Sequence, residues 1–232
     1  MISLNKKTKK LLLLQRNELL TPRQVYFRKK FGRFFFTNFL INYFQDKNLG
    51  LKAWYLFEEE YNTFKNFLPI KAKNILDIGC GLGIINIFLN KTFKNYSNFY
   101  LLDKNHIDKK IRYGFDLNYE GYNNLNETKN ILLSNDINEE RIHLFNVDKT
   151  IVIKNKIDLV ISLKSMGYHY PIKSYIKLFQ NCCTKDTIFI YDVGENQYNE
   201  DYLKTVFKHV QIIYEEKTNN ILRRLYCTNF KL

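Results

Sequence analysis

Three glycines alternate with other residues directly after an acidic residue, in the order Asp77, Gly79, Gly81 and Gly83. An apolar run at 74–78 leads into this segment, and a second apolar run follows it. This order predicts a buried strand, a tight turn and the start of a helix. Because glycine has no Cβ, such a turn lets a ligand press against the backbone. We therefore expect the chemistry of this chain to centre on a small molecule at the end of the first strand.

Strand-like and helix-like segments alternate from residue 73 onward. The expected strands are 73–78, 98–103, 141–147, 157–163, 187–193, 210–214 and 221–228. The expected helices are 83–94, 123–134, 171–182 and 198–205. This alternation indicates an α/β fold with a doubly wound, mostly parallel seven-stranded sheet and helices on both faces. The segment 217–220 is typical of a hairpin turn, so the last two strands add an antiparallel C-terminal hairpin.

Residues 1–70 differ from the rest, because they combine basic and aromatic side chains with little strand signal. The pair Thr21 and Pro22 is typical of an N-cap and the first residue of a helix. The expected helices of this region are 24–44 and 51–67. We expect residues 1–70 to form an N-terminal helical cap over the sheet, and residues 71–232 to form the doubly wound domain.

The net charge of this 232-residue chain is +13, which favours an anionic partner. The chain is also rich in Lys, Asn, Ile, Tyr and Phe, which AT-rich codons specify, so genome composition could raise the lysine content without any partner. Local clustering is harder to explain by composition: ten basic residues and one acid, Glu18, lie within residues 6–33. Both explanations stay open.

No apolar run approaches the roughly 18 residues that span a bilayer, which argues against a transmembrane segment. The apolar run at 11–14 follows a basic start but is too short for a signal peptide. The four cysteines, Cys80, Cys182, Cys183 and Cys227, show neither zinc-ligand spacing nor a disulfide pattern. We therefore expect a cytoplasmic protein with reduced cysteines.

The dinucleotide-binding fingerprint requires Gly-x-Gly-x-x-Gly, and Ile84 occupies the position of its last glycine. The observed order is instead Asp-x-Gly-x-Gly-x-Gly. On this motif the chain resembles class I (Rossmann-like) S-adenosylmethionine-dependent methyltransferases, from about Lys73 to the C-terminus. The resemblance implies direct transfer of a methyl group from S-adenosyl-L-methionine, in which alignment of nucleophile, methyl carbon and sulfur supplies most of the rate.

The resemblance also implies roles for individual residues. Asp77 would face the methionine ammonium, and Asp103, which ends the second expected strand, would accept both ribose hydroxyls with its two oxygens. Asp148 matches a position that often binds the adenine amino group, and Asn146 or Val147 are alternatives there. The other residues expected at the cofactor are Gly79, Cys80, Gly81, Gly83, Lys104 and Lys164. Purely local roles in turns and caps stay open for the three acids.

The segment 162–171 follows the fourth expected strand, and the resemblance implies that it lines the acceptor pocket. His169 titrates near neutral pH and is therefore suited to take a proton from a hydroxyl. We expect His169 to act as this base, and Tyr168 and Ser165 to orient the acceptor. A structural hydrogen bond in the loop before Pro171 is the alternative role of His169.

Several signatures of related enzymes are missing. The segment after the fourth strand lacks the Pro-Pro dipeptide of amino-DNA methyltransferases, and neither Cys182 nor Cys183 follows a proline, as the nucleophile of cytosine-C5 enzymes does. A metal-dependent O-methyltransferase would carry an acid where this chain has Lys164, and only Asp192 and Glu195 follow the fifth strand. We therefore expect no catalytic metal.

The leading interpretation is a methyltransferase that acts on a small-molecule or sugar-like hydroxyl. A second interpretation is an RNA or DNA methyltransferase whose basic, aromatic N-terminal region holds phosphates and stacks bases. A third is a non-catalytic binding module with the same fold, since fold alone does not prove activity. The long connection at 111–122 is a candidate lid over the site. The acceptor and the oligomeric state are not predicted.

Overall fold

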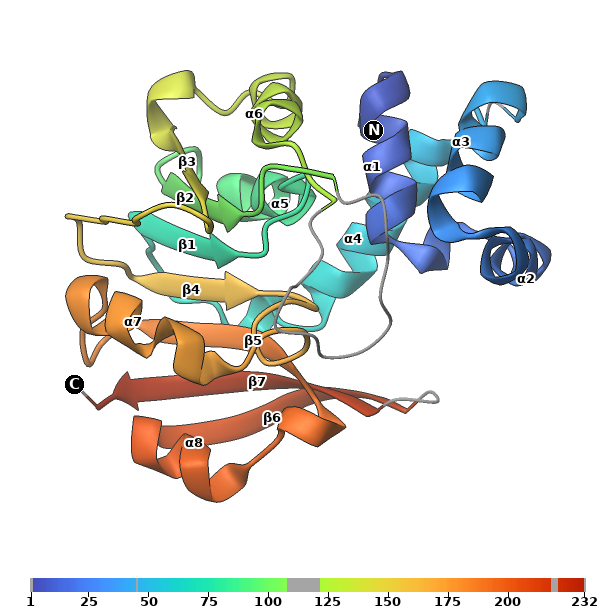
Figure 1. The fold of residues 1–232 in the computed structure, drawn as a ribbon. Coiled ribbons are helices and arrows are strands. Elements are labelled where there is room, and N and C mark those ends of the chain that lie inside the picture. Colours follow the sequence, from blue (N-terminus) through green and yellow to red (C-terminus); the bar gives the residue numbers. More distant parts are fainter. Residues whose placement is uncertain (1, 45, 108–121, 218–220, 232) are drawn as a thin grey trace.

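The computed structural model describes residues 2–44, 46–107, 122–217 and 221–231. Its centre is a seven-stranded sheet in the order β3-β2-β1-β4-β5-β7-β6 (Figure 1). The strands are β1 (Asn74–Ile78), β2 (Asn98–Asp103), β3 (Ile142–Asn146), β4 (Leu159–Ser162), β5 (Ile188–Gly194), β6 (Phe207–Lys217) and β7 (Ile221–Phe230). Strands β1 to β5 are parallel, and β7 runs antiparallel between β5 and β6. The predicted sheet, including its antiparallel C-terminal hairpin, is confirmed.

The order of strands reverses next to β1. From β1 the chain steps outward to β2 and β3, and then crosses back to β4 on the other side of β1. In open α/β sheets this reversal leaves a crevice beyond the carboxyl ends of the strands, where ligands bind. The glycine turn that follows β1 lies at this position.

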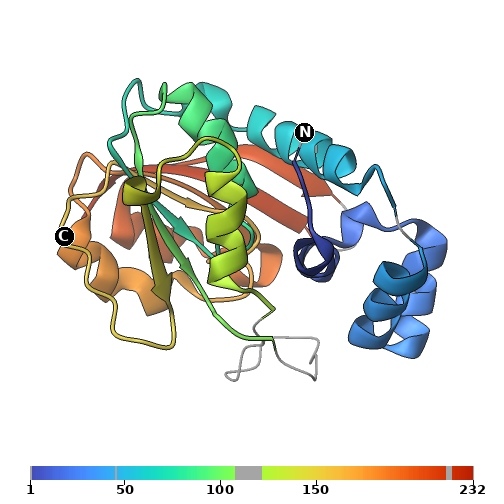
Figure 2. The ribbon, with the colours of Figure 1, turned by 90° about the horizontal axis from the view of Figure 1, so that it is seen from above.

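Side chains on the central strands alternate between two apolar cores, as the twofold period of a strand requires. Ile75 and Leu101 belong to one core, and Leu76 and Leu102 belong to the other. The first core is covered by α4 (Leu49–Asn62), α5 (Ile84–Thr92) and α6 (Leu125–Leu133). The second is covered by α7 (Ile176–Cys182) and α8 (Glu200–Val206). Helices therefore cover both faces of the sheet (Figure 2).

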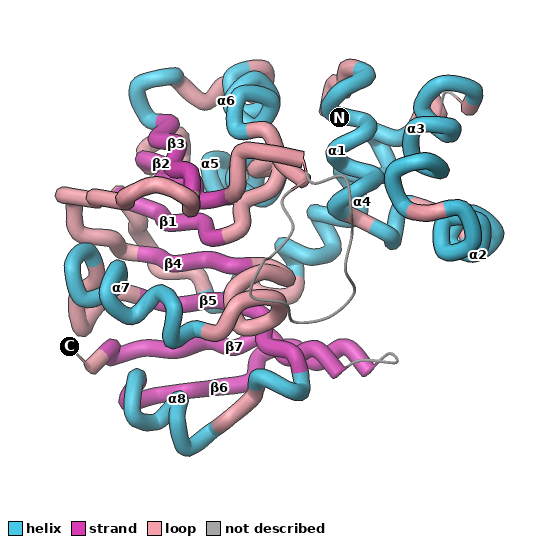
Figure 3. Tube along the Cα trace, viewed as in Figure 1, coloured by secondary structure: helices cyan, strands magenta, loops and turns pink. Residues whose placement is uncertain are grey.

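Three more helices lie beyond the carboxyl ends of the parallel strands: α1 (Lys6–Gln15), α2 (Pro22–Phe31) and α3 (Arg33–Tyr43) (Figure 1). The sequence patterns did not predict α1. Its leucine run at 11–14, which resembles the start of a signal peptide, is buried in the structure. Within the described residues that precede β1, the chain forms only helices and loops (Figure 3).

The prediction of a single helix at 24–44 is wrong. Gly32 separates α2 from α3 with a φ of +88°, a conformation that a residue with a Cβ rarely adopts. The predicted start of α2 is confirmed, because the Thr21 hydroxyl accepts from the backbone N–H of Gln24 at 3.3 Å. The Gln24 side chain in turn accepts from the backbone N–H of Thr21 at 2.9 Å, which completes a capping box.

Two expected segments fall largely outside the described residues. The candidate lid at 111–122 is described only at Tyr122, so its role stays a prediction. Most of the turn expected at 217–220 is not described either, but the backbone register pairs Lys217 with Ile221, as a hairpin between β6 and β7 requires.

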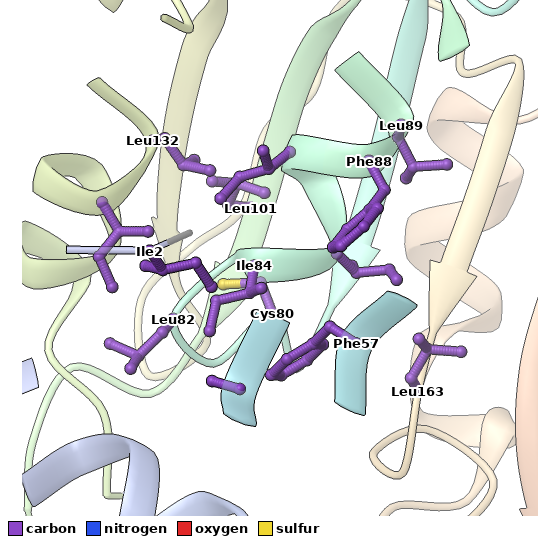
Figure 4. Packing of buried hydrophobic residues seen from close by; sticks show 14 of the residues in the cluster. Ile2, Phe57, Cys80, Leu82, Ile84, Phe88, Leu89, Leu101, Leu132 and Leu163 are labelled. Atoms are coloured by element: carbon purple, nitrogen blue, oxygen red, sulfur yellow. The ribbon is translucent and has the colours of Figure 1, made fainter. Parts of the chain in front are cut away.

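The N-terminal helices and the glycine turn share one apolar core. Figure 4 shows Ile2 and Phe57 close to Cys80 and Leu82 of the turn, and all four side chains belong to the core that also contains Ile75. This continuity places the N-terminal helices directly beside the carboxyl ends of the strands.

Candidate active site

The glycine turn after β1 is left-handed at three positions. Gly79, Gly81 and Gly83 have φ angles of +70°, +53° and +71°, a region that favours glycine. The backbone N–H groups of Gly79 and Cys80 donate to the carbonyl of Leu102 at 2.7 and 3.2 Å. These bonds join the turn to the end of β2, so the ends of the two strands form one continuous edge.

Two side chains lie against the first glycines of the turn. A Cβ on Gly79 would overlap the Ser165 side chain, and a Cβ on Gly81 would come within 2.8 Å of Gln15 Oε1. Gln15 ends α1, and its amide also donates to Asn123 Oδ1 at 3.2 Å. The space that the missing Cβ atoms leave is therefore taken by protein atoms from α1 and from the loop after β4.

Asp77 is buried in β1 directly before the turn. Its Oδ2 accepts from Asn86 Nδ2, in the first turn of α5, at 2.6 Å. Burial raises the pKa of Asp77 to about 7, although the Asn86 hydrogen bond opposes the shift, and the nearby Asp103 raises the pKa further. The negative form of Asp77 is thus unfavourable here unless a positive group is close.

Asp103 ends β2 and contacts the same turn. Its Oδ2 accepts from the Gly81 N–H at 2.6 Å and from Asn123 Nδ2 at 3.1 Å, and its Oδ1 accepts from the Lys104 N–H at 2.7 Å. Desolvation nevertheless raises the pKa of Asp103 to about 6. The carboxyl group is therefore oriented by backbone and amide donors, and neither these donors nor the charge of Lys104 outweighs its burial.

Within the described residues, no ion pair reaches Asp77 or Asp103. Arg16 is near enough to lower the pKa of Asp77 slightly, but its guanidinium binds Glu60. We refer to Asp77 and Asp103 as the acid pair. Burying negative charge without a bonded cation costs several kcal/mol, so the acid pair suits a positively charged ligand.

The other predicted cofactor residues have partners of their own. Burial raises the pKa of the Cys80 thiol, which makes it unreactive. Asp148 is exposed, and its Oδ2 lies 3.3 Å from Nδ1 of His106. Lys164 Nζ lies 2.5 Å from Glu18 Oε1. A contact of Asp148 or Lys164 with a cofactor stays a prediction.

The loop after β4 brings the predicted acceptor residues together at the turn. The carbonyl of Ser165 accepts the backbone N–H groups of Tyr168 and His169 at 3.1 and 2.7 Å. Because the Ser165 side chain lies against Gly79, this compact loop is fixed beside the glycine turn. Ser165, Tyr168 and His169 thus come from one loop at the same edge as the acid pair.

The His169 ring packs edge-on against Tyr168, with ring centroids 4.9 Å apart. Desolvation and, to a smaller extent, the charge of Arg33 lower the pKa of His169. The imidazole is therefore neutral at neutral pH and able to accept a proton. In the part of the chain that the structure describes, no hydrogen bond to the ring is present that would support the alternative structural role.

A second group of charges at this edge was not predicted, and its members range from the buried Asp192 and Arg224 to the exposed Glu18. We call it the ion-pair joint, and it consists of Arg16, Glu18, Glu60, Lys164, Asp192 and Arg224. The Arg224 guanidinium donates to both oxygens of Asp192 at 2.7 and 2.9 Å. The Arg16 guanidinium donates to both oxygens of Glu60 at 2.9 Å each. Three positive and three negative groups thus connect α1 and α4 to the sheet.

The amide donors of the acid pair were also missed. Asn86 interrupts the apolar run at 84–89, and a single polar residue in a buried helix face is a usable signal for a buried partner. Asn123 carries no such signal, because it follows a long connection and precedes the Asn124 side chain that caps α6. Only the folded chain brings Asn123 to Asp103.

Among the described residues, no group of three or more His, Cys, Asp or Glu side chains is placed to hold a metal ion. None of the described helices has the length and apolar character needed to cross a membrane. A hollow of about 660 Å³ lies among the N-terminal helices, against Leu13 and Leu40, and not at the glycine turn.

No protein-family model matches this chain, and no curated protein matches it in sequence. Similar solved structures include a ribosomal protein L11 methylase from Lactobacillus delbrueckii subsp. bulgaricus, with 13% identity over 72% of this chain and 75% of that chain and a TM-score of 0.49. A precorrin-6y C5,15-methyltransferase from Geobacter metallireducens has 11% identity over 74% of this chain and 88% of its own, with a TM-score of 0.47.

The 16S rRNA N2 G1207 methyltransferase of T. thermophilus, solved with AdoMet and guanosine, has 11% identity over 76% of this chain and 43% of its own, with a TM-score of 0.49. At these identities the similarity concerns the fold alone. The strand order and register described above establish that fold independently.

Proposed function

We propose that this chain is an S-adenosylmethionine-dependent methyltransferase. One observation carries the proposal: the acid pair lies at a glycine turn at the switch point of the sheet, with raised pKa values and no ion-pair partner among the described residues. A ligand that brings positive charge to these carboxyl groups offsets the cost of ionising them. S-adenosylmethionine has two positive groups, its sulfonium and its ammonium.

The residues at the turn fit this cofactor. Asp77 would bind the ammonium group, and Asp103 would accept hydrogen bonds from the ribose hydroxyls. The Gln15 side chain that lies against Gly81 is long and flexible, so it can rotate away without movement of the backbone. When bound, the cofactor supplies a methyl group that its positively charged sulfur has already activated.

For the acceptor, the structure supports a small molecule or a sugar-like group with a hydroxyl. His169 is neutral at neutral pH, because desolvation and Arg33 lower its pKa, so it can take the proton from that hydroxyl. Ser165 and Tyr168, in the same compact loop, would orient the acceptor.

Two alternatives keep the fold and change the function. A nucleic-acid methyltransferase is supported by the exposed cations and aromatic rings of the N-terminal helices. A non-catalytic module would bind the cofactor or a relative without methyl transfer. The first alternative differs from the leading proposal in its acceptor, and the second differs in that no methylated product is formed.

Calorimetry of the full chain with S-adenosylmethionine, S-adenosylhomocysteine and NAD tests the cofactor. We expect both methionine-derived ligands to bind and NAD not to bind, and no affinity for either methionine-derived ligand would contradict the proposal. Transfer of a labelled methyl group to metabolites, glycans and RNA then separates the three functions. Binding without transfer to any of these acceptors would favour the non-catalytic module.

A further inference from the structure

Helices α2 and α3 expose a continuous set of aromatic rings, which we call the aromatic strip. It consists of Tyr26, Phe27, Phe31, Phe39, Tyr43 and Phe44. Neighbouring rings have centroids 5.3–6.2 Å apart, and the buried Phe36 joins the α2 rings to the α3 rings. The six rings are 40–74% exposed. Scattered exposed rings are normal, but a contiguous set of this size marks an interaction surface.

Positive charge accompanies the aromatic strip. Arg23, Lys29 and Lys30 are exposed on α2, and the ammonium of Lys30 lies 5.8 Å from the centroid of the Phe31 ring. Residues 19–45 include no Asp or Glu. The surface therefore combines apolar rings with uncompensated cations, and its partner must offer both an apolar region and negative charge.

The aromatic strip lies at the end of the molecule that is remote from β6. Figure 2 shows α2 and α3 on the outer side of α1, away from the sheet. The last two rings of the strip, Tyr43 and Phe44, also border the hollow of about 660 Å³, together with Lys6 and Lys9 of α1. Asp46 lines the same hollow and lies near Lys9 and Lys52, so the positive charge without a nearby acid is that of α2.

We propose that the aromatic strip and its flanking cations dock on an anionic lipid membrane surface. Rings at such an interface insert among the headgroups and upper acyl chains, while lysine and arginine bind the lipid phosphates. A helix surface can bind in this way without crossing the bilayer. The proposal does not depend on the methyltransferase activity, because the strip contains no residue of the acid pair or of the acceptor loop.

Two other occupants fit less well. Single-stranded nucleic acid stacks its bases on free ring faces, whereas Phe27 and Phe31 already stack on each other, with 17° between their planes. A second copy in a twofold interface would pair the surface that carries Arg23, Lys29 and Lys30 with the same cationic surface, which brings like charges close together. A bilayer surface accepts a contiguous set of ring edges and carries the opposite charge.

Sedimentation of the full chain with lipid vesicles tests the proposal. We expect binding to vesicles of phosphatidylcholine with phosphatidylserine, weaker binding to phosphatidylcholine alone, and loss of binding as salt rises. The double variant Phe31→Ser and Phe44→Ser should bind at least about tenfold more weakly, because two rings no longer insert. These rings are 51% and 60% exposed, and their control is Tyr55→Ser with Tyr96→Ser, at 55% and 60%.

The charge contribution has its own matched pair of variants. Lys29→Gln with Lys30→Gln should weaken binding to the anionic vesicles by about thirtyfold, because each lysine contributes about fivefold. Lys65→Gln with Lys73→Gln removes two exposed lysines outside α2 and α3 and should leave binding unchanged. Far-UV circular dichroism and thermal melts confirm that each variant is folded.

A Phe31→Trp variant keeps an aromatic ring in place and adds a second readout. The wild-type protein, in which Trp54 is the only tryptophan, gives the reference emission. The emission that the variant adds to this reference should shift to the blue with phosphatidylserine vesicles. Equal binding to neutral and anionic vesicles, or no loss in the ring and lysine variants, overturns the proposal. A different result would be a protein that does not bind vesicles but instead forms dimers or binds single-stranded RNA. If the ring and lysine variants lose that property, the proposal is overturned in favour of that partner.

Discussion

Glu60 and Asp77 are both buried carboxyl groups at the same edge of the sheet, yet their pKa values move in opposite directions. Burial opposes ionisation of Glu60, but the charges of Arg16 and Arg224 outweigh it and lower the pKa of this group. Burial also opposes ionisation of Asp77, and there the neutral Asn86 amide leaves the pKa raised to about 7. A guanidinium compensates a buried carboxylate and an amide does not. The ion-pair joint is therefore complete, whereas the acid pair requires a cation from outside.

This difference gives the two clusters opposite dependences on pH. The folded pKa of Glu60 lies below its unfolded value, so its contribution to stability is present above the unfolded pKa of 4.5 and is lost as pH falls through the folded pKa. The folded pKa of Asp77 lies above its unfolded value of 3.8, so its contribution is present below 3.8 and is lost as pH rises through about 7. Substitutions in each cluster can therefore be distinguished by pH as well as by size.

The largest expected effect comes from opening the ion-pair joint at Arg224. The variant Arg224→Met leaves Asp192 buried without its bidentate partner, and we expect a loss of about 3–5 kcal/mol in the free energy of unfolding. Urea unfolding measures this loss. Replacement of the neighbouring, partly exposed Arg223 by Met, which breaks a pair with Glu215, should cost about 1 kcal/mol or less.

The double variant Arg224→Met with Asp192→Leu separates the loss of a partner from the loss of packing. Because it removes both buried charges, most of the stability should return. A double variant as unstable as Arg224→Met alone would mean that shape, and not charge balance, makes the joint important.

The second effect is the pH dependence of Asp77. With the folded pKa at about 7, ionised Asp77 lowers wild-type stability by up to about 4 kcal/mol at about pH 8 relative to about pH 4. Asp77→Asn removes this titration, so the variant should gain stability relative to wild type as pH rises. The measurement is urea unfolding across this pH range.

Glu60→Gln provides the opposite control. Its destabilisation should be greatest at neutral pH, where Glu60 is ionised and paired with Arg16, and should shrink toward acid. Parallel pH profiles of the two variants would show that the acid pair and the joint do not differ as described.

The third effect concerns the cofactor and follows from Asp103. Asp103→Ala should weaken binding of S-adenosylmethionine by about 2–4 kcal/mol, because two charge-assisted hydrogen bonds to the ribose are lost. Since binding favours the ionised form of an acid whose pKa is raised to about 6, wild-type affinity should increase as pH rises from about 5 to about 7. Calorimetry at several pH values measures both effects.

Asp186→Asn is the matched control, since Asp186 is exposed and precedes the start of β5, at the opposite end of the parallel strands from the glycine turn. Its effect on affinity should be much smaller than that of Asp103→Ala. Equal losses in the two variants would contradict the assignment of the acid pair as the main cofactor ligands.

The same comparison explains which features the sequence could predict. The glycine turn and Asp77 are local, because an apolar strand, an acid and three glycines lie within ten residues. The strands and helices follow from the periodicity of apolar residues, which is also visible within a few residues. These signals predicted a mostly parallel seven-stranded sheet with a C-terminal hairpin, and they placed Asp77 and Asp103 at the ends of the first two strands.

The ion-pair joint had no comparable local signal. Arg224 meets Asp192 only because β7 pairs with β5 in one register, and Arg16 meets Glu60 only because the turn that follows α1 packs beside α4. The prediction of a continuous helix at 24–44 failed for a different reason, since the apolar pattern continues through Gly32 while the backbone turns there. Long-range packing and a single backbone angle are not encoded in such patterns.

The smallest expected effect decides to which cluster Lys164 belongs. The family resemblance implies a cofactor contact for Lys164, whereas its ammonium lies 2.5 Å from Glu18 Oε1 and 4.0 Å from Glu60 Oε1, in the ion-pair joint. Lys164→Met should therefore lower the free energy of unfolding by about 0.5–1 kcal/mol, as expected for a partly exposed pair, and leave the affinity for S-adenosylmethionine unchanged. Lys164→Arg keeps the charge and should retain most of the stability. A several-fold loss of affinity in Lys164→Met with unchanged stability would assign Lys164 to the cofactor site instead. A residue that acts only in the ion-pair joint should change the stability of the protein and not its affinity for the cofactor.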